Sequence, residues 1–251
     1  MRPVRSWKST CYIGDWSPLL KIRIRGPESK AFLEYLSTNH WPNFKPFQAK
    51  HAILCQDNGT IMGEGVVMML RNDDFIFTSV PGVTWALHQF HRGSRKFNAT
   101  IDIVTDEWYL FQVQGPKSVE VMEAATQSSV TDLKFMHSKD MSINGSKFWC
   151  LRQGVSGERG FELWGPADEG QAVYKAIMAS GAKYGIRQLG GRAKPVNHKM
   201  ISLCIIDKKY SLPGTEVTVK WGQAGGLQKL IRAIVEPAPY KEDQRKKSLK
   251  V

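Results

Sequence analysis

The sequence lacks the patterns that would place the chain in a membrane or in a disulfide-stabilised fold. It has no run of about 18 apolar residues, the length that a transmembrane helix needs. Its first residues contain no apolar signal region. Only four cysteines occur, with no Cys-x-x-Cys pair among them, which argues against a zinc module or a disulfide framework. We therefore expect reduced thiols, a cytoplasmic protein and no membrane partner.

Signatures of metal and nucleotide chemistry are also missing. There is no His-x-x-x-His pair and no nucleotide-binding loop. His88 and His91 lie three residues apart in a helical pattern, and such a pair is more often a solvated face than a metal site. Gly154-Val155-Ser156-Gly157 fails as a nucleophile elbow, because the required last glycine is Glu158. We expect no bound metal.

Positive charge is in excess. The net charge is +12, and part of it is concentrated in a basic tail, residues 241–251, which we expect to be solvated. A basic surface can bind nucleic acid, but no RNA- or DNA-binding signature accompanies it. An anionic small molecule explains the charge equally well, so nucleic acid is not the favoured partner. The hydrophobic content of 42% predicts a globular chain with a real core.

Two stretches of the chain resemble each other. Residues 20–29 and 109–118 each form a short alternating strand that ends in Gly-Pro and leads into a helical pattern. Each is followed by an Asn-Gly hairpin signal, Asn58-Gly59 in one and Asn144-Gly145 in the other. The repetition predicts two related α+β halves, about 1–108 and 109–198.

The remainder of the chain contains two further helical patterns and a short β-rich segment. The helices are expected over 83–92 and 169–184. Strands are expected over 200–206, 215–221 and 230–235, with glycine and proline turns between them. These strands predict a small all-β domain over 199–240, after a first region covering 1–198.

The segment 152–163 is the most informative for function. Three glycines lead into a strand in which Glu162 stands between Phe161 and Leu163. Neighbouring strand residues point to opposite faces, so Glu162 lies opposite the two apolar side chains. If its face is buried, the carboxylate needs a partner, and the edge of an amidine-like heterocycle could donate two parallel N–H bonds to it. The alternative is an exposed glutamate on a strand.

Residues 157–163, Gly-Glu-Arg-Gly-Phe-Glu-Leu, resemble the G-E-x-G-[FY]-E-[IL] motif of the glycine-cleavage T-protein (aminomethyltransferase) family. That family includes tetrahydrofolate-dependent aromatic O-demethylases. The two strand-Gly-Pro-helix units match its duplicated folate-binding halves. Residues 185–192 and 214–219 resemble its following segment and its C-terminal β domain. The resemblance implies an α+β fold, with two folate-binding halves and a small all-β domain arranged as a cloverleaf around tetrahydrofolate.

The resemblance also implies roles for particular residues. Glu162 would bind the pterin edge of tetrahydrofolate, and Ile103 and Val104 would line the pterin pocket. Asp106 lies near the position of the family's catalytic aspartate, with Glu107 as the neighbouring alternative. Arg192 matches a family arginine near the substrate region.

The sequence departs from the family pattern in three places. The stretch 15–18, Asp-Trp-Ser-Pro, lacks the family's histidine. Lys194 stands where the aromatic O-demethylases have a tyrosine. The chain is also shorter between residue 198 and the β domain. We therefore select three candidates to stabilise a leaving phenol: Tyr12, His51 and Lys194.

The expected function is transfer of a methyl or other one-carbon group to tetrahydrofolate. The preferred version is O-demethylation of a methoxylated aromatic acid, with that small molecule as the methyl donor. Aminomethyl transfer of the glycine-cleavage type is the first alternative. A folate-binding protein without catalysis and a basic RNA-associated module on the same fold are the others. The sequence determines neither the methyl donor nor the oligomeric state.

The placement of the catalytic aspartate gives a first test. Asp106→Asn removes a charge with little change in size, so we expect it to fold normally. If Asp106 is catalytic, turnover should fall by about 100-fold or more. Turnover equal to the wild type, measured as methyl-tetrahydrofolate formed, would remove Asp106 from the candidates.

Overall fold

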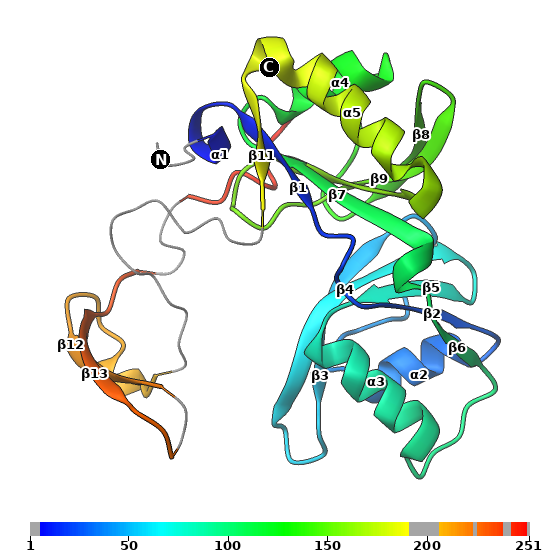
Figure 1. The fold of residues 1–251 in the computed structure, drawn as a ribbon. Coiled ribbons are helices and arrows are strands. Elements are labelled where there is room, and N and C mark those ends of the chain that lie inside the picture. The colour runs from blue at the N-terminus through cyan, green and yellow to red at the C-terminus, as the bar shows by residue number, and fades with distance from the viewer. Residues whose placement is uncertain (1–5, 191–205, 223–224, 238–241, 250–251) are drawn as a thin grey trace. The chain divides into compact units, whose positions relative to one another are not determined.

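A computed structural model describes residues 6–190, 206–222, 225–237 and 242–249 of the chain. It divides into two compact units. The first unit comprises Met1–Ala193 together with Gln244–Val251, and the second comprises Lys194–Asp243 (Figure 1). A helix long and apolar enough to cross a bilayer does not occur among the described residues.

A six-stranded sheet forms one layer of the first unit. Its strand order is β11-β1-β7-β10-β9-β8. The strands are β1 (Cys11–Asp15), β7 (Trp108–Gln114), β8 (Ser138–Ile143), β9 (Ser146–Arg152), β10 (Gly160–Pro166) and β11 (Ile186–Leu189). Helices α4 (Ser118–Thr126) and α5 (Gly170–Gly181) cover one face of it (Figure 1). The short helix α1 (Ser6–Ser9) precedes β1, and the single turns η2 (Ala167–Glu169) and η3 (Ala182–Tyr184) flank α5.

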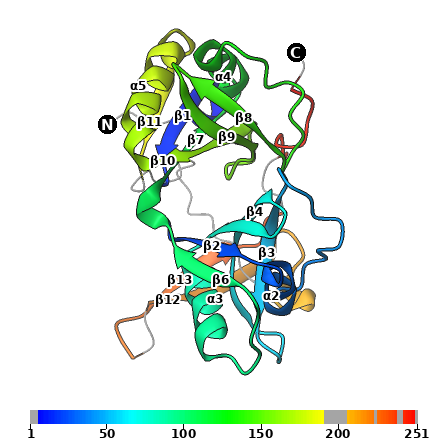
Figure 2. The same cartoon turned by 90° about the vertical axis from the view of Figure 1, so that its right-hand side faces the viewer.

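A five-stranded antiparallel sheet forms the second layer. Its order is β3-β4-β5-β2-β6. The strands are β2 (Lys21–Arg25), β3 (Ala49–Cys55), β4 (Ile61–Arg71), β5 (Asp74–Thr78) and β6 (Thr100–Ile103). Helices α2 (Ser29–Leu36) and α3 (Pro81–Arg92) pack on its outer face (Figure 2). The turn η1 (Thr105–Glu107) connects β6 to β7 and so links the two sheets.

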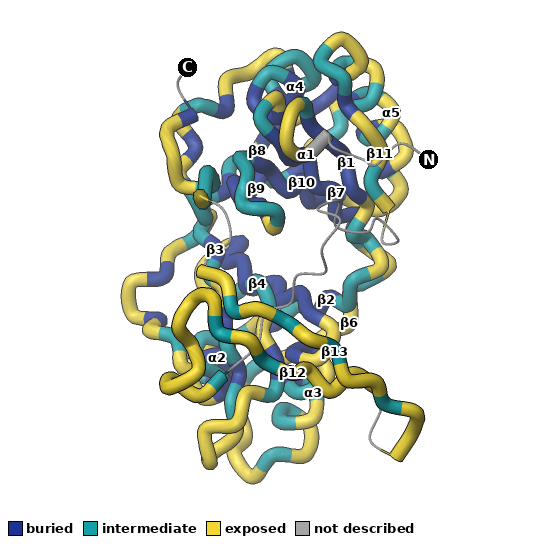
Figure 3. Tube along the Cα trace, turned by 90° about the vertical axis from the view of Figure 1, so that its left-hand side faces the viewer, coloured by how far each residue is buried: buried dark blue, intermediate teal, exposed yellow. Residues whose placement is uncertain are grey.

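The two sheets contact each other through the faces that their helices leave uncovered. Buried apolar side chains from both sheets form one cluster there: Ala49, Met68, Leu70 and Ile76 from the five-stranded sheet, and Leu110, Leu151 and Trp164 from the six-stranded sheet. Figure 3 shows buried residues along the strands of both sheets. Burial of this apolar surface joins the two halves into one unit.

The two Gly-Pro turns of the predicted duplication have the same local geometry. Gly26 has φ +119° and Gly115 has φ +133°, values that favour glycine. In each turn the residue three positions later donates its N–H to the glycine oxygen, Ser29 to Gly26 and Ser118 to Gly115, both at 3.0 Å. Each turn therefore starts its helix, α2 or α4, in the same way.

The boundary between the halves differs from the expected one. Strand β1 comes from the beginning of the chain, yet it lies in the sheet of the second half, parallel to β11 and antiparallel to β7. Residues 11–15 therefore belong to the sheet of the second half, although the expected boundary at about residue 108 assigns them to the first half. Nothing local in β1 specifies its partners, because any alternating strand can pair with either sheet.

The second unit contains one antiparallel pair, β12 (Glu216–Trp221) and β13 (Lys229–Ile234), preceded by the turn η4 (Lys208–Tyr210). Both strands fall where the sequence predicts them. The strand expected over 200–206 lies almost entirely outside the described residues. The basic tail is not fully solvated, because Leu249 is buried in the core of the first unit.

The Gly115 turn predicts a large loss of stability on substitution. A Cβ at this position would lie 2.6 Å from the Thr10 oxygen and 2.7 Å from the Cys11 Cα. We expect Gly115→Ala to lower the free energy of unfolding by about 2–4 kcal/mol, from the clash and the positive φ together. Gly145→Ala is the control, because Gly145 has φ +89° but nothing within 4 Å, so about 1 kcal/mol is expected. Equal losses in urea denaturation would contradict the clash.

Candidate functional site

Polar side chains gather on the uncovered face of the six-stranded sheet. Along β7 the residues alternate, so Phe111 and Val113 pack in the helix-side core while Gln112 and Gln114 point to the other face. Register places Glu162 of β10 opposite Gln112 and Tyr12 of β1 opposite Gln114. All four polar side chains are buried.

Hydrogen bonds link three of these side chains. The Tyr12 hydroxyl lies 2.9 Å from Gln112 Oε1 and 2.7 Å from Gln114 Oε1. A phenol has one proton, so it donates to one of these oxygens at a time. Burial raises the pKa of Tyr12 well above its usual value, and Glu162 adds to this effect. Tyr12 is therefore a neutral donor at physiological pH.

Glu162 is a buried carboxyl group with weak partners. Its Oε2 accepts from Trp164 Nε1 at 3.3 Å and its Oε1 from Gln112 Nε2 at 3.5 Å, both long for hydrogen bonds to a charged group. Burial raises the pKa of Glu162 from 4.5 to about 7, although the Trp164 bond opposes the shift. The carboxylate is thus short of N–H donors, and a ligand that brings them would stabilise its ionised form.

The Trp16 indole lies over Gly14, in the same row of the six-stranded sheet as Gln112 and Glu162. Gly14 of β1 stands opposite Gln112 in the register, and its lack of a side chain leaves room for the Trp16 and Tyr12 rings. A Cβ at Gly14 would come within 3.2 Å of Trp16 Nε1 and 3.6 Å of Tyr12 Cε2. The Trp16 indole N–H is itself buried and has no acceptor. Donor and acceptor groups that need partners therefore lie in one row of the sheet. We call the four residues of this row the cradle: Gly14, Trp16, Gln112 and Glu162.

The loop 154–158 is attached to the edge of the cradle through Gln114. Its Oε1 lies 3.2 Å from the Val155 N and 3.3 Å from the Ser156 N, and its Nε2 donates to the Glu158 oxygen at 2.9 Å. Gly154 and Gly160 are required here, because a Cβ at either would lie under 3.0 Å from the Gln114 side chain. One glutamine thus holds both the loop and Tyr12.

The candidates Ile103, Val104 and Asp106, which come just before β7, lie apart from the cradle. Ile103 is on the edge strand β6 and 62% exposed, whereas Val104 is buried. Both line a separate hollow of about 660 Å³ with Arg23, Arg25 and His91. Asp106 is exposed in η1, beyond Trp108. Trp108 is itself four strand residues from Gln112, about 13 Å along β7, so Asp106 does not contact Glu162.

The other selected residues divide between the sheets. Tyr12 lies in the cradle's hydrogen-bond network, as described. His51 lies on the edge strand β3 of the five-stranded sheet, exposed and 3.7 Å from the equally exposed Glu64 carboxylate. Arg192 and Lys194 lie outside the described residues. Among the described residues no group of three or more His, Cys, Asp or Glu side chains could hold a metal.

Sequence reasoning did not identify four residues of this region: Gln112, Gln114, Trp16 and Lys21. Two glutamines at alternating positions of an otherwise apolar strand were a usable signal for a buried polar face. Lys21 is fully buried, and its Nζ donates to the Ser17 oxygen at 2.7 Å and the Leu19 oxygen at 3.0 Å. Burial lowers its pKa from 10.5 to about 8. Lys21 therefore stabilises the crossover between β1 and β2 rather than the cradle.

The two sheets with their Gly-Pro turns define a two-sheet α+β fold, and comparisons with known proteins assign the chain to a family. The chain belongs to the family of the GCVT N-terminal domain, which matches residues 2–217. Its fold is similar to the glycine cleavage system aminomethyltransferase T of Bartonella henselae, with a TM-score of 0.72. That match covers 96% of this chain and 89% of the other, at 15% identity.

The curated relatives are more similar to this chain in sequence than that solved structure is. The chain is 32% identical to a syringate O-demethylase of Sphingobium sp. SYK-6 over 77% of this chain and 44% of the relative. It is 29% identical to a sesamin methylene transferase of Sinomonas sp., over 83% and 46%. It is 27% identical to an aminomethyltransferase of Oceanobacillus iheyensis, over 78% and 55%. The chain therefore spans about half the length of the curated relatives it matches.

The raised pKa of Glu162 predicts a pH-dependent stability. Between its unfolded pKa of 4.5 and its folded pKa of about 7, the native state binds more protons than the unfolded state, so stability falls as pH rises. Glu162→Gln removes this dependence. Without ligand, the variant should be more stable than the wild type at pH 7.5 by roughly 2–3 kcal/mol.

Urea denaturation at several pH values measures this difference. Glu64→Gln is the matched control, because Glu64 is exposed and its loss should leave the slope unchanged. Parallel pH profiles for the wild type and Glu162→Gln would show that the carboxyl group is not buried as described.

Proposed function

We propose that the cradle binds the pterin ring of tetrahydrofolate and that the chain takes part in one-carbon transfer to that cofactor. The observation that carries the proposal is that an underpartnered buried carboxyl group, Glu162, and an orphaned buried donor, Trp16 Nε1, lie along one row of the sheet, which also holds Gly14 and Gln112. A planar heterocycle with N–H donors and ring acceptors along its edge fits this arrangement.

The residues present fit such a ring. Glu162 would accept two parallel N–H bonds when ionised, which would lower its raised pKa. Gln112 would hold the carboxylate in place, and Trp16 would donate to a ring or carbonyl acceptor. Leu110 and Trp164 border the cradle in the next row of the sheet and would exclude water from these bonds. When bound, tetrahydrofolate would supply the nitrogen that accepts the one-carbon group.

We propose O-demethylation of a methoxylated aromatic acid as the reaction. The name of the syringate O-demethylase relative supports this choice. The stacked rings of Trp108 and Trp149, with centroids 4.9 Å apart, would give an aromatic donor a surface to stack on. Such a donor needs a proton or a cation at its leaving oxygen. Tyr12 is protonated and lies at the cradle, so it is the preferred candidate, with Lys194 and His51 as the others.

Aminomethyl transfer is the second candidate. Several relatives are named aminomethyltransferases, and the cradle would bind the cofactor in the same way for either reaction. In that case a carboxylate such as Asp106 would orient the accepting nitrogen. A folate-binding protein without catalysis would need only the cradle.

Calorimetric titration with tetrahydrofolate tests the cradle. We expect the wild type to bind, and Glu162→Gln to bind at least about tenfold more weakly, because a neutral amide accepts less strongly than a carboxylate. Gly14→Val should also weaken binding by displacing the Trp16 indole, because a Cβ at Gly14 would lie 3.2 Å from Trp16 Nε1. Glu64→Gln should bind as the wild type does. Wild-type affinity in Glu162→Gln and Gly14→Val would refute the site.

Product analysis separates the reactions. With methoxylated benzoic acids, the O-demethylase proposal predicts methyl-tetrahydrofolate and the corresponding phenol. Methylene-tetrahydrofolate formed from an aminomethyl donor would instead support the second candidate. Folate binding with neither product would favour the non-catalytic role.

A further inference from the structure

Residues 244–249 lie against the loop that borders the cradle, and we call them the strap. The Gln244 N–H donates to the Gly157 oxygen at 2.8 Å, and the Arg245 guanidinium lies 3.4 Å from the Gly154 oxygen. Leu249 is buried with the residues that pack α4 and α5 on the six-stranded sheet. The strap therefore contacts two of the five residues of the loop and is anchored in the core beyond it.

Arg152 connects the strap to the sheet. It ends β9, immediately before the loop, and its side chain is 7% exposed. Its Nη1 donates to the Leu133 oxygen at 2.9 Å, and its Nη2 donates to the oxygens of Arg245 and Lys247. Two of its three acceptors thus come from the strap.

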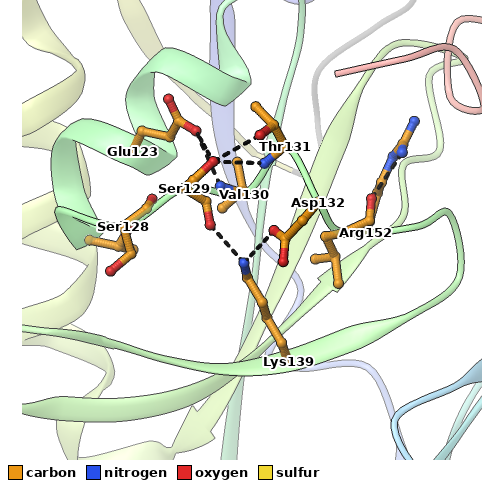
Figure 4. Close-up of polar contacts among 10 residues, drawn as sticks. Glu123, Ser128, Ser129, Val130, Thr131, Asp132, Lys139 and Arg152 are labelled. Carbon is orange, nitrogen blue, oxygen red and sulfur yellow. Dashed lines mark hydrogen bonds and ion pairs between the residues drawn. The ribbon is translucent and has the colours of Figure 1, made fainter. Parts of the chain in front are cut away.

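The turn that supplies the third acceptor is itself fixed. Lys139 donates to the Ser129 oxygen and to Asp132, both at 2.6 Å, and Glu123 accepts from Ser129 and Val130 (Figure 4). Leu133 follows this turn directly. The guanidinium therefore bridges a rigid turn and the strap.

Among the described residues, no carboxylate forms an ion pair with Arg152, and its Nε has no partner. Burial together with the nearby Arg159 lowers its pKa. A buried cation without its acceptors is costly. Loss of the strap would leave the guanidinium with one carbonyl, so the chain around residue 152 would have to move to expose it to water.

We propose that the strap, acting through Arg152, positions the loop 154–158 at the edge of the cradle. This inference rests on the proposed folate site. The loop is held from one side by Gln114 and from the other by the strap, and Gln114 also holds Tyr12. Displacement of the strap would loosen the loop, free Gln114 and change the place of Tyr12 beside Gln112. Arg152 is thus a positioning residue, and it does not touch the ligand.

Hydrogen exchange tests the inference without any ligand. In a variant that lacks residues 244–251, the Val155 and Ser156 amides should exchange at least about tenfold faster, because their bonds to Gln114 open more often. Arg152→Lys should act in the same direction, since a lysine head cannot bridge Leu133 and the strap as a fork. Lys147→Ala, an exposed change on the same strand, should have no effect.

Rescue separates positioning from general destabilisation. A synthetic peptide of residues 244–251, added to the shortened variant, should restore slow exchange at Val155 and Ser156. It should also restore tetrahydrofolate affinity, which we expect to fall about tenfold in the shortened variant. Unchanged exchange in the shortened variant, or a rise spread evenly over the first unit that the peptide does not reverse, would overturn the inference.

The test also separates this inference from the proposed function. If the wild type does not bind tetrahydrofolate, the folate site is refuted, while the exchange rates still decide whether the strap holds the loop. If binding is intact and insensitive to the strap, the positioning role is refuted and the folate site stands.

Discussion

The alternation of strand β7 is the constraint on which the rest of the site depends. One face of the strand carries Phe111 and Val113 into the helix-covered core, and the other carries Gln112 and Gln114. A shift of one residue in its pairing would exchange these faces, burying two amides among apolar side chains. The apolar face therefore fixes the register, and the register in turn places Glu162 opposite Gln112. The core and the cradle are two consequences of one pairing.

The duplication places different side chains at equivalent strand positions of the two halves. Aligned on their Gly-Pro turns, Arg23 and Arg25 of β2 correspond to Gln112 and Gln114 of β7. In the first half the arginines form ion pairs with Asp74 and Asp102 at 2.7 Å and line the hollow of about 660 Å³ described above. In the second half neutral amides replace them beside Glu162, whose carboxyl group remains short of donors. The same backbone therefore supports ion-paired arginines in one half and buried amides beside a carboxyl group in the other.

Two buried ionisable groups, Glu162 and Arg152, lower the stability of this fold. Glu162 is buried with two long hydrogen bonds, and Arg152 is buried with carbonyl acceptors but no counter-ion in the part of the chain that the structure describes. Both arrangements lower stability in the absence of a compensating partner. In the first case the compensation would come from a ligand, and in the second it comes from the strap. Gln112 and Tyr12 connect Glu162 to Gln114, and the loop 154–158 connects Gln114 to the strap.

The sequence by itself determined the local structure: the Gly-Pro turns, the hairpins at Asn58 and Asn144, and the alternation that buries Glu162. These follow from backbone preferences and from the two-residue period of strands, which act over a few residues. Only the tertiary structure decided that β1 joins the sheet of the second half, that Asp106 and Ile103 lie away from Glu162, and that the basic tail docks beside Arg152. Those outcomes depend on contacts between residues about 90 to 175 positions apart, and neither propensity nor periodicity reports which distant strand or carbonyl a residue will meet.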